Sequence, residues 1–168
     1  MDDFLHSKLP QVSTTRAAEI VGVGYEGLRS YLKRGLLGRV GMLPGFHRPG
    51  GGTHDDPAPR QKWRRFGFID LCLMRTAKLL IDAGLRFEEA SAIVSKPEMW
   101  KRMAYDREPV DRYVLASPAC GIHMIFDRDD ISHLPDRLEE ARAHGAFMLV
   151  PLGDVQRYVV EMLAREVV

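Results

Sequence analysis

Residues 13–37, with the sequence STTRAAEIVGVGYEGLRSYLKRGLL, contain two short amphipathic patterns separated by glycines. Ser13 stands before the first pattern, where a hydroxyl side chain can cap a helix, and Gly22 follows its last apolar residue. The second pattern begins after Val23 and ends at Gly35, and its larger side chains recur at helical spacing: Tyr25, Leu28, Tyr31 and Leu32. The spacing predicts two short helices joined by a glycine turn. This is the form of a helix-turn-helix, whose second helix enters the major groove of DNA.

The charges are divided unevenly along the chain. The whole chain has a net charge of +1, but residues 1–104 hold 17 Lys and Arg against 11 Asp and Glu, a net charge of +6. Residues 105–168 hold 7 against 12, a net charge of −5. Nine basic side chains fall within residues 29–65, where only two acidic ones occur. This distribution indicates that the N-terminal half binds a polyanion; the alternative is a solvated charged face with no partner.

Length and composition exclude several classes of protein. The 168 residues are 45% hydrophobic and 28% charged, with a mean hydropathy of −0.20, which is typical of a soluble chain of one domain or two small ones. The two cysteines, Cys72 and Cys120, lie far apart, which argues against a disulfide scaffold or a thiolate metal cluster. No run approaches the roughly 18 apolar residues of a membrane span, and the start is acidic. We expect a cytoplasmic protein.

The remaining segments predict helices first and strands later. Residues 38–62 contain six glycines and four prolines and favour a long loop, either disordered or contacting DNA through Arg48, Arg60 and Lys62. Helices are predicted at 68–84, 87–94 and 131–141, and strands at 63–66, 112–117, 121–126 and 146–150. A final helix has an apolar stripe that serves either as intrachain core or as a dimer seam: Val155, Tyr158, Val159, Met162 and Leu163.

Three segments of the N-terminal part carry a resemblance to a known family: Leu28-Arg29-Ser30-Tyr31-Leu32-Lys33-Arg34-Gly35-Leu36-Leu37, Trp63-Arg64-Arg65-Phe66, and Ala83-Gly84-Leu85-Arg86-Phe87-Glu88-Glu89. In this order they resemble the recognition-helix signature, the wing segment and the junction of the next two helices in the MerR-type transcription regulators. The resemblance covers about residues 10–95. A departure follows it, because Pro97 and Pro109 leave no room for the long dimerisation helix of that family.

The resemblance implies a fold class and a function. The expected fold is a mainly α N-terminal winged helix-turn-helix domain, residues 1–95 with an extended wing loop at 38–62, followed by a small α+β C-terminal domain. Residues 96–111 would connect the two, and residues 112–168 would serve dimerisation or bind an effector or partner. The expected function is sequence-specific DNA binding and transcription regulation, as a dimer at a promoter or operator.

The same resemblance assigns the DNA contacts. Tyr25, Glu26 and Arg29 would face bases or nearby phosphates, and the hydroxyl of Tyr31 would donate to a phosphate. Lys33 and Arg34 add positive charge to this helix, and Arg64 and Arg65 would reach the backbone from the wing. Physical chemistry points the same way, because the guanidinium fork fits guanine or phosphate, and clustered cations release counterions from the duplex.

Partners and alternatives complete the expectation. The partners are double-stranded DNA, a second copy of the chain in a homodimer, and RNA polymerase or another protein; no membrane, cofactor or metal is expected. A cation site at His47, His54, Asp55 and Asp56 is disfavoured because the surrounding glycines offer no rigid geometry. Catalysis by Cys120 and His123 is disfavoured because no orienting third group can be placed. The alternative function is an adaptor that uses the winged domain for protein contacts.

Overall fold

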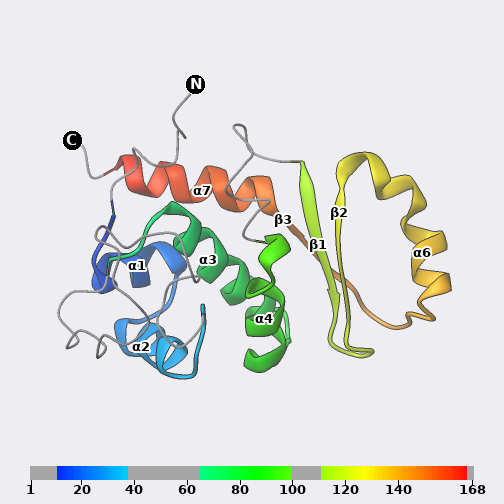
Figure 1. Cartoon of the computed structure of the whole chain (residues 1–168), viewed down its shortest axis with the longest axis horizontal. Helices are drawn as coiled ribbons and strands as arrows, with labels where there is room; N and C mark the ends of the chain where they lie inside the picture. The colour runs from blue at the N-terminus through cyan, green and yellow to red at the C-terminus, as the bar shows by residue number, and fades with distance from the viewer. Residues whose placement is uncertain (1–10, 38–64, 100–110, 166–168) are drawn as a thin grey trace, which may run out of the picture.

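The computed structural model describes residues 11–37, 65–99 and 111–165, which form helices at the N-terminal end and a sheet in the C-terminal half (Figure 1). The elements are α1 (Thr14–Val21), α2 (Tyr25–Lys33), α3 (Phe68–Asp82), α4 (Phe87–Val94), β1 (Arg112–Ser117), β2 (Ile122–Asp127), the 3-10 helix η2 (Arg128–His133), α6 (Leu134–Glu140), β3 (Met148–Pro151) and α7 (Leu152–Ala164).

The predicted helix pair at the N-terminus is confirmed. The Ser13 side chain accepts a hydrogen bond from the backbone N–H of Arg16, 3.4 Å away, and starts α1. Gly22 ends α1 at φ +81°, and its N–H donates to the Ala18 and Glu19 carbonyls. A Cβ at Gly22 would also lie 2.5 Å from Nη1 of Arg75, so a larger residue would strain the backbone and displace the Arg75 guanidinium.

Helix α3 lies at the centre of the core. Its buried residues cover several sides of the helix: Phe68, Leu71, Cys72, Leu73, Met74, Thr76, Ala77 and Leu80. A helix with so wide an apolar surface needs neighbours on several sides. Helices α1, α4 and α7 supply them, and α7 runs back along α1 and α3 (Figure 1).

One side chain links three of these helices. Arg75 of α3 donates from Nη1 to the carbonyl oxygen of Val21, 2.8 Å away at the end of α1. Its guanidinium also lies over the ring of Tyr158 in α7, 4.6 Å from the ring centroid. The turn that precedes α2 is therefore held by Arg75, which rests in turn on Tyr158 near the C-terminal end of the described residues.

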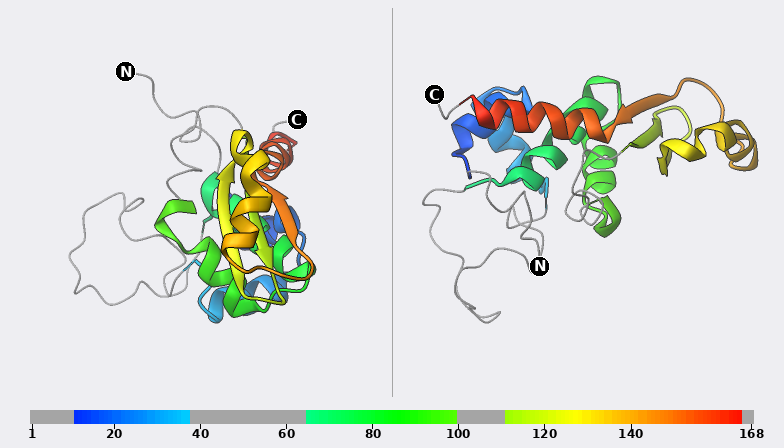
Figure 2. Two further views of the ribbon diagram at one scale, coloured as in Figure 1. Left: turned by 90° about the vertical axis from the view of Figure 1, so that its right-hand side faces the viewer. Right: turned by 90° about the horizontal axis from the view of Figure 1, so that it is seen from above.

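The sheet has the strand order β2-β1-β3, and both pairings are antiparallel. Val114 and Ala116 face the helices and join the main core together with Val150. The neighbouring residue Leu115 and its face-mate Phe126 are buried on the opposite face. There η2 and α6 lie in front of the sheet, away from the helices (Figure 2).

The expected fold class is wrong. The expectation was a mainly α winged helix-turn-helix domain followed by a small α+β domain, but the described residues form one mixed α/β arrangement with a single three-stranded antiparallel sheet. Two packing features explain the difference. The apolar stripe of α7 packs on α3 and joins the C-terminal half to the N-terminal core. In place of the strand predicted near Phe66, one isolated bridge joins Phe66 to Val12, with N–H to carbonyl distances of 3.0 Å in both directions.

The boundaries predicted at residues 95 and 111 stay a prediction. The long loop at 38–62 and most of the connector at 96–111 lie outside the described residues. No helix within residues 11–37, 65–99 and 111–165 is long and apolar enough to cross a membrane.

Candidate nucleic-acid interface

Helix α2 has one buried side and one broad exposed side. Leu28 and Leu32 are buried against the core, with exposures of 0% and 7%. The exposed side chains of α2 and its cap are polar, aromatic or basic: Tyr25, Glu26, Arg29, Ser30, Lys33 and Arg34. Figure 1 places α2 at the end of the molecule opposite α6. The helix therefore presents a surface of mixed polarity, rich in donors, at one end of the fold.

The first turn of α2 brings together three of the predicted DNA-binding residues. Nη1 of Arg29 lies 3.3 Å from Oε1 of Glu26, and the Arg29 guanidinium lies 5.7 Å from the centroid of the Tyr25 ring. Both charged side chains are more than half exposed, so the pair contributes about 1 kcal/mol or less. Arg29 is thus oriented by weak, solvent-exposed contacts, which it can exchange for a phosphate or for the O6 and N7 atoms of guanine.

The last turn of α2 is fastened to α4. The Tyr31 ring packs on the Phe87 ring with a centroid distance of 5.3 Å and a tilt of 44°. Arg34 donates from Nη2 to Oε1 of Glu88 at 2.6 Å, and its guanidinium carbon lies 3.8 Å from the Phe87 centroid. The pKa of Glu88 is lowered because Arg34 donates a hydrogen bond to the carboxylate. These two side chains orient α2 within the fold, and their expected contacts with DNA stay a prediction.

The other predicted basic residues are placed less uniformly. Lys33 is exposed and, within the described parts of the chain, forms no ion pair. Arg65 is exposed and donates to the carbonyl oxygen of Gln11, 3.4 Å away, next to the Val12–Phe66 bridge. No hydrogen bond among the described residues joins Arg65 to α2. Arg64, predicted for the wing, lies outside the described residues, as does Trp63.

The apolar stripe of α7 is used inside the chain. Val155, Val159 and Leu163 belong to the buried core, with exposures of 4% or less. Tyr158 and Met162 are partly buried and pack against it. Of the two roles left open for this stripe, the structure uses Val155, Val159 and Leu163 as intrachain core.

Cysteine chemistry and metal binding gain no support from the geometry. Burial, with a smaller contribution from Asp70, raises the pKa of the Cys72 thiol well above its usual value. A hydrogen bond from the Ser117 side chain lowers the pKa of Cys120, but no ion pair orients this thiol in the part of the chain that is described. The described residues contain no group of three His, Cys, Asp or Glu side chains that could hold a metal. His47, His54, Asp55 and Asp56 lie outside them.

Sequence reasoning missed the residues that position α2. Phe87 and Glu88 contact Tyr31 and Arg34 across more than 50 positions of the chain, so helical spacing gives no sign of the contact. The only signal was the resemblance at Ala83–Glu89, which placed a helix there without naming its neighbour.

The comparisons with known proteins do not assign the chain to a family, so its function is inferred from the geometry described above. A scan of protein-family models finds no match to the chain, and a search of the curated proteins finds none either.

Proposed function

We propose that this chain is a sequence-specific double-stranded DNA-binding protein that regulates transcription, with α2 in the major groove. The observation that carries the proposal is the placement of Tyr25, Arg29 and Lys33 along the outer side of α2. These residues are four positions apart, so they follow one exposed stripe of the helix, while Leu28 and Leu32 fix the neighbouring stripe to the core.

Charge and backbone geometry support the same function. The segment 29–65 has nine basic side chains against two acidic ones, and such a segment gains free energy by displacing the cations condensed on a duplex. Gly24 precedes α2 without a side-chain cap, so the first amide groups of the helix are open to a phosphate. The similarity of residues 28–37 to a MerR-type recognition helix agrees with this role.

The proposal includes a homodimer that reads two half-sites and a contact with RNA polymerase or another protein. Helix-turn-helix proteins bind paired half-sites about one helical turn apart, so two copies of α2 would contact successive major grooves. On this proposal the protein acts by occupying a promoter or operator.

The test is DNA binding with paired arginine variants. Fragments bound from genomic DNA are selected first, and their affinity is then measured by fluorescence anisotropy over a range of salt concentrations. Arg29→Ala should lose about 1 to 3 kcal/mol of discrimination between the selected site and a scrambled one. Lys33→Gln should weaken both sites alike and lower the salt slope by about 1.

Arg157→Ala is the matched control. Arg157 in α7 is as exposed as Arg29, and like Arg29 it forms an ion pair with an acidic residue three positions earlier, here Asp154. The control variant should bind DNA as the unmodified chain does. An equal loss in Arg157→Ala and Arg29→Ala, or binding without salt dependence, would contradict the assignment of α2 and favour an adaptor role.

A further inference from the structure

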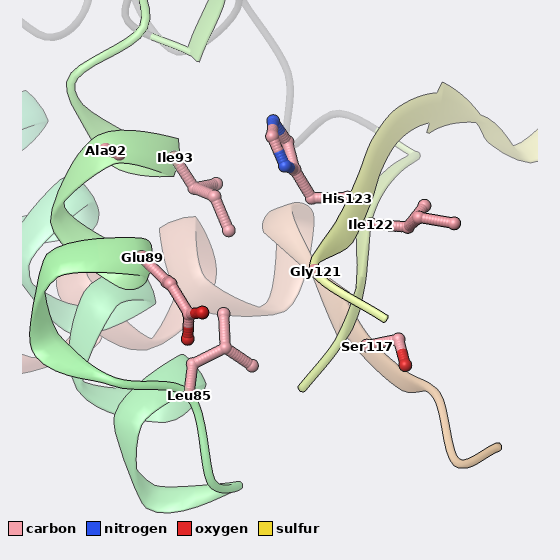
Figure 3. A pocket seen from close by; sticks show the side chains of 8 residues that line it. All are labelled: Leu85, Glu89, Ala92, Ile93, Ser117, Gly121, Ile122 and His123. Carbon is pink, nitrogen blue, oxygen red and sulfur yellow. The ribbon is translucent and has the colours of Figure 1, made fainter. Parts of the chain in front are cut away.

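A small cleft lies between α4 and the turn that joins β1 to β2 (Figure 3). Its volume is about 170 Å³. Leu85 and Ile93 project from the α4 side toward the hairpin, and the His123 imidazole projects back from β2. Gly121 brings the backbone of the turn to the opposite wall without a side chain. The cleft thus lies between the helical half of the fold and its sheet.

The wall on the α4 side is apolar and well supported. Leu85 and Ile93 are 6% and 3% exposed, so their positions are fixed by packing. Ala92 adds a small side chain at the opening and leaves room beside it. Because an apolar cavity of about 150 Å³ can hold benzene, a ring-sized molecule matches the volume here. A drug-sized ligand would need about 300 Å³ or more.

The charge at the edge of the cleft is positive. The Lys96 ammonium contacts Nε2 of His123, and an ammonium group can only donate, so Nε2 accepts and the ring proton lies on Nδ1. Burial and the charge of Lys96 lower the pKa of His123, which keeps the imidazole neutral near pH 7. Among the described residues, Lys96 therefore has a polar partner but no anionic one.

The acidic residue in the cleft is Glu89, and its negative charge is compensated by Arg86. Glu89 accepts from Nη2 of Arg86 at 2.7 Å and from the Arg86 backbone N–H at 3.0 Å. Both contacts lower the pKa of Glu89, the side-chain hydrogen bond most. A cationic ligand would have to displace Arg86, whereas an anion would be attracted by the Lys96 ammonium, which contacts the lining residue His123. The chemistry of the edge favours a carboxylate.

Helix α4 connects this cleft to the proposed DNA-binding helix. Phe87 and Glu88 hold Tyr31 and Arg34 of α2, and residues of the same helix or next to it line the cleft. We propose that the cleft binds a ring-sized apolar carboxylate and that its occupancy changes the affinity of α2 for DNA. The second part rests on the proposed function. It requires that α4 can take two positions and that the ligand binds the protein with a different affinity in each.

Binding is tested on the full chain by isothermal titration calorimetry with benzoate, and with benzamide as the uncharged control. Benzoate should bind at least about tenfold more tightly than benzamide, because the ammonium stabilises the carboxylate alone. Lys96→Met should weaken benzoate about tenfold, whereas Lys78→Met, which removes the same charge from α3, should not. Ala92→Leu should fill the opening and abolish binding, whereas Ala164→Leu, at an exposed alanine of α7, should not. Both exposed alanine sites accept leucine without entering the core, and circular dichroism verifies folding.

Two results would overturn the site: no benzoate binding, or equal affinities for benzoate and benzamide. Unchanged affinity in both Lys96→Met and Ala92→Leu would also exclude it. The coupling is then measured as DNA affinity with and without saturating benzoate, together with the amide NMR shifts of Tyr31 and Arg34. Benzoate binding with neither change would contradict the coupling. Benzoate binding and shifts in α2 without any DNA binding would support the site and its coupling to α2 and refute the proposed function alone.

Discussion

The helices around α3 and the outer layer formed by η2 and α6 differ in how much surface they bury. Eight residues of α3 are buried, whereas no residue of η2 or α6 is. Both regions contain apolar residues at helical spacing. The core helices are covered on several sides, but the outer layer covers only one face of a three-stranded sheet. The free energy of folding is therefore concentrated in the helices packed around α3 rather than in the outer layer.

The two regions also differ in charge. Helix α2 presents Arg29, Lys33 and Arg34 against Glu26, whereas residues 128–140 contain five Asp and Glu against two Arg. If the chain binds DNA as proposed, this distribution of charge would attract a duplex to the α2 end and repel it from the outer layer. The surface proposed to bind DNA thus sits on the firmly packed region, where the position of a helix is well determined.

Truncating a core leucine should have the largest effect. Leu71→Ala removes a side chain with 0% exposure from α3 and should lower the free energy of unfolding by about 2 to 5 kcal/mol. Urea denaturation followed by circular dichroism measures this loss. A loss below about 1 kcal/mol would show that α3 is not the centre of the core.

The same substitution in the outer layer should cost much less. Leu138 in α6 is only half-buried, so Leu138→Ala should lower the free energy of unfolding by about 1 kcal/mol or less. The two leucine variants form a matched pair in one urea experiment. Similar losses in both would remove the distinction between the two regions.

The smallest effect concerns the contact between the helices and the sheet at Lys96 and His123. Burial, followed by the charge of Lys96, lowers the pKa of His123 below its usual value of 6.5. The unfolded chain therefore takes up a proton first as the pH falls through about 6.5, and the free energy of unfolding decreases there. Above that pH, His123 is neutral in both the folded and the unfolded chain, so its titration no longer lowers the free energy of unfolding.

Denaturation curves recorded between about pH 5 and pH 8 should show this decrease, and His123→Gln should remove it. Lys96→Met should reduce it, because one of the two causes of the lowered pKa is lost. A curve for His123→Gln that is identical to that of the unmodified chain would place the pH dependence elsewhere.

Local elements were predictable from the sequence because their signals are local. The pattern predicted the bounds of α4 at 87–94 and of β1 at 112–117 as the structure has them, and Ser13 and Gly22 marked the ends of α1. Caps, glycines and side-chain spacing act within one or two turns, so they can be read without knowing the neighbours.

The arrangement of these elements was not predictable. The stripe at Val155, Val159 and Leu163 showed that α7 has an apolar face, but spacing does not say which surface covers it. That pairing, α7 on α3, is one of the two packing features that overturned the expected fold class. The candidate interface was found in part, because exposure of Arg29 and Lys33 follows from helical spacing, whereas the fastening of Arg34 by Glu88 depends on the tertiary fold.

The position of Arg75 has a consequence for the order of folding during synthesis. The side chain needs both the end of α1 and the ring of Tyr158, which are separated by well over 100 residues. An N-terminal helix pair that leaves the ribosome early still lacks the aromatic surface against which Arg75 rests. The turn before α2 therefore acquires its final support only when α7 has been translated, so a stalled or shortened chain would lack part of the support that positions α2.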